Sequence, residues 1–407
     1  MATIAARTNV TRALVILLGA AVFLNYVDRG AISVAAPLMK GELGLTATEF
    51  GTAVSAFFWI YAPVQLVTGW LCDRFSVYRL MALGVVVWAL STLLMGFVGG
   101  FLLLLVLRVL LGVGESIVFP GSGKIIARHV PPEGRGLANA WCAAGIALGP
   151  ALGTLAGGMI VASLGWRAMF VAFGLATLIW LWPWQRIVDG LPEVHPGTRE
   201  PTVPVRRLFE KWELWAMGIG HACGNYGFYF LLAWLPLFLV QQRGLSIEQM
   251  TLLASLGYAV QGAAAFTLGS ISDRWTRSGR SEAVIRRWML ALGQLLMALC
   301  ILGIGFSENI LAVGILLCLA GVASGSLSVN LYSVAQMFAG PRAAGTWIGI
   351  QNAVGNISGI LGPIVSGMLI DQMGYGSAFV LAAAVAAFGG IWWIIGIPRI
   401  AQVIAND

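Results

Sequence analysis

The sequence predicts an all-α polytopic membrane protein with twelve transmembrane helices in two six-helix bundles. Of its 407 residues, 59% are hydrophobic and only 10% are charged, whereas a soluble protein carries about 25% charged residues. Apolar stretches of about 20 residues, long enough to cross a bilayer, recur from one end of the chain to the other. A single long polar, proline-rich segment, at residues 187–212, separates the first six stretches from the last six.

The apolar stretches are expected to be helices, because lipid offers no hydrogen-bond partner to an open backbone. The first stretch lacks a small-residue cleavage site, so we interpret it as a retained helix rather than a signal peptide. Residues 1–186 then form the N-terminal bundle, 187–212 a cytoplasmic linker and 213–407 the C-terminal bundle. The expected helices span residues 13–35, 51–71, 78–98, 100–122, 138–162, 166–186, 213–240, 248–270, 286–306, 309–334, 343–370 and 376–398.

The basic residues predict that both termini are cytoplasmic. In that orientation, of the 24 Lys and Arg residues, 19 lie inside, two lie within helices (Arg29 and Arg108) and three lie outside: Lys40, Arg167 and Arg243. This division obeys the positive-inside rule, which the reverse orientation violates. Because the positive charges are spread over short loops, they indicate membrane topology rather than nucleic-acid binding.

The two halves repeat each other. "GWLCDR" at 69–74 and "GSISDR" at 269–274 each follow the second expected helix of their half, 200 positions apart. "GPALG" in the fifth helix has a counterpart, "GNISGILGP", in the eleventh. An internal duplication around a central linker is typical of a two-bundle transporter.

These residues resemble a known family. The G-x-L-x-D-R loop and the twelve-helix layout are similar to the major facilitator superfamily. Four stretches resemble its anion:cation symporter branch, which includes bacterial sugar-acid transporters and vesicular glutamate and sialic acid carriers. They are N-Y-x-D-R at 25–29, F-F-W-x-Y at 57–61, "RVLLGVGESIVFP" at 108–120 and "GWRAMF" at 165–170.

The chain departs from the vesicular members of that branch. Its seventh helix has no arginine, and its second helix has Tyr61 and Gln65 where some members have a histidine. The resemblance therefore implies a substrate like those of the bacterial sugar-acid members, a hexonate or a hexuronate.

Four charged residues lie inside expected helices of the first half: Asp28, Arg29, Arg108 and Glu115. At about 1.5 Å rise per residue, Arg29 and Arg108 come at comparable depth in a core about 30 Å thick. Asp28 and Arg29 point about 100° apart on their helix, so they do not face each other. Arg108 and Glu115 share a face, but contact between them would need both side chains extended.

Such residues are expensive at membrane depth and are functional by default. Two arginines at matched depth suit bidentate binding of a carboxylate. Burial favours the neutral form of a carboxyl, so Asp28 and Glu115 can carry protons. The resemblance implies the same roles. The alternative is that the four charges only neutralise one another as buried ion pairs, which contribute little to stability.

Other residues complete the expected site. Polar side chains of the second half suit the hydroxyl groups of a sugar acid. The substrate-binding set is Arg29, Arg108, Tyr61, Tyr229, Asn330 and Asn356. The repeated loops suit gating, since an aspartate can cap a neighbouring helix and pair with an arginine. The gating set is Gly69, Asp73, Arg74, Asp273 and Arg274.

The predicted function is proton-coupled import of a small organic anion by alternating access, in the inner membrane of a cell and as a monomer. An exporter or exchanger of an aromatic or amphipathic carboxylate is the alternative, and a non-transporting receptor is a further one. No nucleophile–base pair or metal-ligand cluster is evident, so we expect neither an enzyme, nor a cofactor, nor a bound metal. The five cysteines lack paired spacing and histidine neighbours, which argues against a disulfide framework or a zinc site.

Overall fold

The structure, a computed structural model, consists of helices joined by short loops. It describes residues 2–130, 135–189, 191, 205–397 and 399–403. Most of the predicted linker lies outside these residues, and so do the side chain of Asp73 and the surroundings of Gly69. Within the described residues, eleven helices are long and apolar enough to cross a membrane. The helix α2, at 28 residues, is also long enough to do so.

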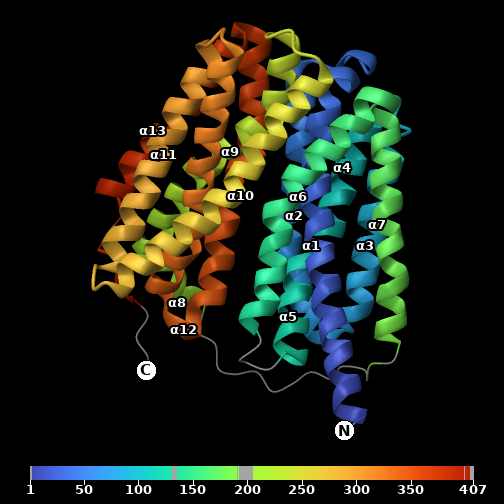
Figure 1. The fold of residues 1–407 in the computed structure, drawn as a ribbon, viewed down its shortest axis with the longest axis vertical. Helices are drawn as coiled ribbons and strands as arrows, with labels where there is room; N and C mark the ends of the chain where they lie inside the picture. The colour runs from blue at the N-terminus through green and yellow to red at the C-terminus, as the bar shows by residue number, and fades with distance from the viewer. Residues whose placement is uncertain (1, 131–134, 190, 192–204, 398, 404–407) are drawn as a thin grey trace. The chain divides into compact units, whose positions relative to one another are not determined.

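The first of two compact units comprises Met1–Leu45, Thr52–Gly197 and Gly244–Ser255. Its long helices run side by side, blue to green in Figure 1, and α1 packs against α6 while α3 packs against α4 and α7. The helices that make up most of this unit are α1 (Ala2–Glu42), α2 (Ala47–Arg74), α3 (Val77–Met95), α4 (Phe101–Glu115), α5 (Val118–His129), α6 (Arg135–Leu164) and α7 (Trp166–Val188).

The second unit comprises Thr46–Gly51, Thr198–Arg243 and Leu256–Asp407. Here α11 packs against α12 and α13, and α9 packs against α12 and α13. Its helices are α8 (Val205–Phe209), α9 (Trp212–Gln241), most of α10 (Ile247–Arg277), α11 (Glu282–Phe306), α12 (Ile310–Met373) and α13 (Tyr375–Ile395). The division into bundles at residues 187–212 stays a prediction.

One predicted span is interrupted in the structure, and two others meet at a kink. The span 100–122 is broken at Ser116 and Ile117, between α4 and α5, where apolar residues on both sides hide the break from a hydropathy pattern. The spans 309–334 and 343–370 both lie within α12, as two helices on either side of a kink at Gly340. That residue has a φ of 68°, which glycine adopts without steric cost.

A stripe of glycines on α6 brings this helix against α1, next to the Asp28 and Arg29 turn. A Cβ atom on Gly149 would lie 2.9 Å from the carbonyl oxygen of Phe23, and one on Gly153 would lie 2.8 Å from the Cα of Val27. Small residues let membrane helices approach closely enough for their backbones to pack. The charged turn of α1 is therefore held on a rigid helix pair.

Candidate functional site

Arg29 on α1 pairs with Glu115, the last residue of α4. Its Nε lies 3.3 Å from the Glu115 Oε2, longer than the roughly 2.7–2.9 Å of a strong charge-assisted hydrogen bond. The Glu115 side chain is fully buried, at 0% exposure, whereas Arg29 keeps 14%. The pair is therefore loose, and only its cationic partner is open to a ligand.

Three aromatic rings surround the Arg29 guanidinium. Its central carbon lies 4.6 Å from the ring centroid of Tyr61, 4.9 Å from that of Tyr26 and 5.3 Å from that of Phe57. Ring faces attract a cation at such distances while excluding water from it. The Tyr61 hydroxyl accepts a hydrogen bond from Gln65 at 2.9 Å. The structure therefore places Tyr61 beside Arg29, and the role of both in substrate binding stays a prediction.

Arg108 is held differently from Arg29. It is buried, and its Nε and Nη2 donate to the carbonyl oxygens of Ala53 and Val54, both at 3.1 Å. A helix carbonyl can accept this second bond because its oxygen has two lone pairs. The guanidinium of Arg108 also lies 5.2 Å from the Phe57 ring centroid, so both arginines flank one ring. Arg108 therefore ties α4 to α2 as well as adding positive charge to the site.

The close approach of α4 to α2 depends on Gly112. A Cβ atom at this position would lie 2.4 Å from the carbonyl oxygen of Phe57 and 3.0 Å from the Ile60 Cγ2. Gly112 lies one turn after Arg108 and one turn before Glu115. Its lack of a side chain thus allows α4 to pack closely against α2 at this level.

Asp28 points away from Arg29 and into α3. Its carboxyl is buried, at 3% exposure. Its Oδ2 accepts hydrogen bonds from the Trp88 indole N–H and from the Thr92 hydroxyl, the latter at 3.2 Å. Among the described residues, Oδ1 is buried without a hydrogen-bond partner. The two carboxyls of the site thus have separate surroundings, Asp28 against α3 and Glu115 against Arg29.

In the second unit, Tyr229 and Asn356 lie together. The Tyr229 hydroxyl donates to the Asn356 Oδ1 at 2.8 Å, which joins α9 to α12. Asn356 is buried, and Tyr229 is partly exposed. This pair presents neutral polar groups, and its contact with substrate hydroxyls stays a prediction.

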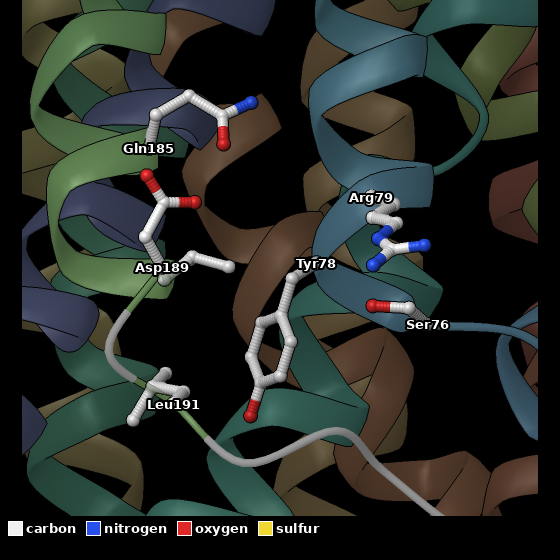
Figure 2. Close-up of a pocket in the computed structure, with 7 residues that line it drawn as sticks. Ser76, Tyr78, Arg79, Gln185, Asp189 and Leu191 are labelled. Carbon is white, nitrogen blue, oxygen red and sulfur yellow. The ribbon is translucent and has the colours of Figure 1, made fainter.

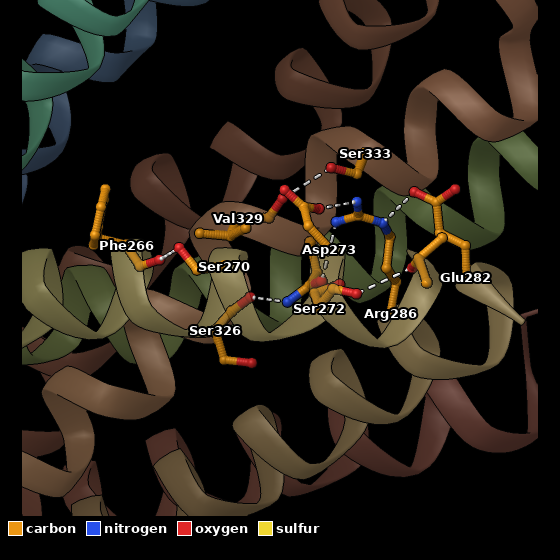
Figure 3. A network of polar contacts seen from close by, with 11 residues as sticks. Phe266, Ser270, Ser272, Asp273, Glu282, Arg286, Ser326, Val329 and Ser333 are labelled. Atoms are coloured by element: carbon orange, nitrogen blue, oxygen red, sulfur yellow. Dashed lines mark hydrogen bonds and ion pairs between the residues drawn. The ribbon is translucent and has the colours of Figure 1, made fainter. Parts of the chain in front are cut away.

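Asn330 lies with a different set of residues. Its Oδ1 is 3.4 Å from an Arg286 nitrogen, and its amide nitrogen donates to the Ser326 carbonyl oxygen at 2.8 Å. Arg286 also contacts Glu282 at 2.7 Å and Asp273 at 3.4 Å, a network drawn in Figure 3. The structure therefore groups Asn330 with a charged network that includes one of the predicted gating residues.

Of the other predicted gating residues, Arg74 and Arg274 are exposed, and Arg74 lies 4.4 Å from the ring centroid of Trp70. Asp273 pairs with Arg286 rather than with a loop arginine. Gly69 and Asp73 belong to the last turns of α2, and the surroundings of Gly69 and the side chain of Asp73 are outside the described part.

A cavity of about 200 Å³ lies apart from this charged site, where α3 begins and α7 ends. Figure 2 shows its lining, which includes Ser76, Tyr78, Arg79, Gln185 and Asp189. None of the predicted site residues contributes to it, so it does not bear on the substrate site.

Residues 18–284 and 278–403 match the family model described as Major Facilitator Superfamily. The chain belongs to the major facilitator superfamily. Its fold is also that of a bacterial homologue of the human lysosomal transporter Spinster, at a TM-score of 0.81 and 19% identity over 96% of each chain.

Curated relatives of this superfamily member are named as transporters. A protein of Cupriavidus necator named probable sulfoacetate transporter SauU is 30% identical, covering 91% of this chain and 90% of its own. The probable galactarate/D-glucarate transporter GudP of Bacillus subtilis is 29% identical, covering 98% and 94%. The chloroplastic ascorbate transporter of Arabidopsis thaliana is 27% identical, covering 93% and 73%. The protein is therefore a multi-pass membrane transporter and not an enzyme.

Sequence reasoning did not assign three residues that contact this transporter's predicted site. Trp88 and Thr92 are four positions apart on α3, a spacing that places both on one helix face. Arg286 follows Glu282 at the same spacing, which is a sequence signal for a helical ion pair. Neither pattern reveals which carboxyl the side chains contact, because that depends on helix packing.

We expect Gly112→Ala to disrupt the site. The added methyl group meets a backbone oxygen at 2.4 Å, so α4 must move away from α2, and overpacking of this kind costs about 1–3 kcal/mol. The purified variant should melt at a lower temperature than the wild type.

Gly123→Ala on α5 is the matched control for this substitution. Nothing lies within 4 Å of a Cβ atom there, and alanine favours a helix over glycine by about 0.5–1 kcal/mol. Equal melting temperatures for the two variants would contradict the packing role of Gly112.

Proposed function

We propose that this transporter is a proton-coupled symporter that imports a small organic anion by alternating access. The observation that carries the proposal is the Arg29–Glu115 pair, in which a partly exposed guanidinium faces a fully buried carboxyl. The coarser part, transport of an organic anion, is supported by the family match and by relatives named for sulfoacetate, galactarate and glucarate.

The coupling follows from competition for Arg29. While Glu115 is ionised, it satisfies the positive charge of Arg29 and weakens the attraction for an incoming anion. When Glu115 takes a proton, Arg29 loses its counter-charge and the carboxylate of the substrate replaces it. Anion and proton then favour each other's binding, and by linkage each raises the affinity for the other equally.

Asp28 is the second proton site of the proposal. Its carboxyl interacts electrostatically with Arg108, and its hydrogen bonds among the described residues come from Trp88 and Thr92. A proton on Asp28 therefore changes the net charge of the site without direct competition with substrate. The substrate class we propose is a sugar acid, a hexonate or a hexuronate. The Tyr229–Asn356 pair of the second unit offers hydrogen-bonding groups that suit its hydroxyls.

The remaining parts of the proposal concern topology and gating. We place the protein in the inner membrane with both termini cytoplasmic, which accords with the positive-inside rule. Asp273 and its partner Arg286 act in gating, and Asn330 connects α12 to them. We propose the same gating role for Asp73 in the first half, because the end of α2 that carries it repeats the sequence around Asp273 in α10.

A second candidate is an exporter or exchanger of an aromatic carboxylate. The three rings around Arg29 favour it, because they give an aromatic ligand surfaces to stack on. A thermal-shift panel of D-glucarate, D-gluconate, D-glucuronate, sulfoacetate and benzoate separates the two candidates, since a bound ligand raises apparent stability. A shift with benzoate alone would favour the second.

Arg29→Lys should abolish binding of the panel anion that stabilises the wild type most. Lysine keeps the charge but loses the planar fork that holds a carboxylate by two bonds, so affinity should fall more than about tenfold. The measurement is ligand titration of the purified variant. Arg186→Lys, an exposed arginine at the end of α7, is the control that should bind normally. Normal affinity in Arg29→Lys would exclude Arg29 as the anion site.

Asp28→Asn and Glu115→Gln should retain binding of the same anion but lose accumulation driven by a pH gradient. Each side chain then resembles a permanently protonated carboxyl, which cannot release a proton. The measurement is uptake into proteoliposomes, with a pH gradient or a sodium gradient imposed separately at fixed membrane potential. Wild-type uptake should rise as external pH falls and should ignore sodium. Full pH-driven accumulation by both variants would refute the assignment of the carboxyls.

A further inference from the structure

The Asp28 carboxyl is held asymmetrically. Both of its hydrogen-bond donors, the Trp88 indole and the Thr92 hydroxyl, approach Oδ2, and among the described residues Oδ1 has no hydrogen-bond partner. All three side chains are buried. Trp88 and Thr92 lie on one face of α3, so a single helix holds a single carboxyl oxygen.

The chemistry of the two donors determines which oxygen of the Asp28 carboxyl can take a proton without losing a hydrogen bond. The indole nitrogen of Trp88 carries a hydrogen in every state and cannot accept a hydrogen bond. A proton placed on Oδ2 would keep the Trp88 bond only if it pointed elsewhere, for example at the Thr92 oxygen, and the Thr92 hydroxyl would then have to turn its own hydrogen away from Asp28. A proton on Oδ1 leaves both existing bonds intact. The carboxyl can therefore gain and lose a proton on Oδ1 without rearranging its contact with α3.

Among the residues that the structure describes, few charged groups face Asp28. From α4, Arg108 and Glu115 interact with it electrostatically, and Arg29 follows it on α1. From α3 it meets the neutral Trp88 and Thr92. The charged residues described on α6 and α7 lie toward the ends of these helices. Trp88 and Thr92 are thus the neutral groups that contact the Asp28 carboxyl directly and adjust its proton affinity.

We propose that Trp88 and Thr92 are positioning residues that fix the Asp28 carboxyl by Oδ2 and direct the coupling proton to Oδ1. They also set the pH range in which the transporter couples to protons, because hydrogen bonds to Oδ2 are stronger when the carboxyl is ionised. This inference rests on the proposed role of Asp28 as a proton site.

The protonated oxygen can be identified by infrared difference spectroscopy of the full-length protein, recorded between low and high pH. The carbonyl stretch of the protonated carboxyl is assigned to Asp28 by its loss in Asp28→Asn. If the proton is on Oδ1, the carbonyl is C=Oδ2, whose stretch is lowered by the bonds it accepts. Trp88→Phe and Thr92→Val should then each raise its frequency. An Asp28 band that moves in neither variant would overturn the proposal.

Transport should respond in a defined direction. Removing a donor to the ionised carboxyl makes the proton bind more tightly, so the pH midpoint of D-glucarate uptake, or of whichever panel anion the wild type transports, should rise. The expected shift is about one pH unit for Trp88→Phe. Thr92→Ser, which keeps the hydroxyl, should restore the wild-type midpoint that Thr92→Val changes. An unchanged midpoint in both Trp88→Phe and Thr92→Val would also overturn the proposal.

Matched controls separate positioning from packing. Trp184→Phe removes an equally buried indole whose N–H donates to the Tyr78 carbonyl oxygen at 3.2 Å, and it should leave both the infrared band and the midpoint unchanged. Ser91→Ala, which removes a hydroxyl bonded to the Val87 carbonyl oxygen, is the control for Thr92→Val. Shifts of similar size in the controls would refute a specific role for the two residues.

Measurements on Asp28→Asn distinguish failure of the proton site at Asp28 from failure of the positioning role of Trp88 and Thr92. If no titrating carboxyl band disappears in Asp28→Asn and its uptake keeps the wild-type pH response, the proposed proton site fails. If Asp28 titrates and couples but Trp88→Phe and Thr92→Val change nothing, only the positioning role fails.

Discussion

The ion pair between Arg29 and Glu115 places two charges at membrane depth, and the arrangement of the first unit holds this pair together. Taking a charge out of water costs several kcal/mol, and attraction to a partner of opposite charge offsets this cost only when the geometry is good. Here the Arg29 Nε lies 3.3 Å from the Glu115 Oε2, so attraction to Glu115 offsets the desolvation cost only in part. Such a pair contributes little to stability, and in the proposed mechanism a substrate anion replaces Glu115 as the partner of Arg29.

The surrounding helices prevent the pair from collapsing or separating. The glycine stripe of α6 fixes α1, which carries Arg29, and Gly112 fixes α4, which carries Glu115. Arg108 adds two hydrogen bonds between α4 and α2. The rings of Phe57 and Tyr61, both on α2, then enclose the Arg29 guanidinium. Each of these contacts would be lost if one helix moved by a few ångströms. The contacts of the charged site therefore depend on the close backbone packing of the helices.

Much of the fold and part of the site follow from the sequence. Hydropathy alone locates the helices, because a bilayer imposes their length, and the four buried charges stand out because charges are rare in apolar runs. The partners of these charges do not follow. Helical spacing places Arg108 on the same face as Glu115, whereas in the structure Arg29 from another helix pairs with Glu115. Similarly, Asn330 resembles Asn356 in sequence context, but only its packing shows that it contacts Arg286.

The central claim is that a bound anion and a proton on Glu115 replace the Arg29–Glu115 contact together. Calorimetric titration of the purified protein with the panel anion that binds best tests this directly, when repeated in buffers of different ionisation enthalpy. The account predicts that binding takes up protons in the wild type and takes up fewer in Glu115→Gln. Anion binding with no proton uptake in the wild type, at any pH between 6 and 8, would contradict it.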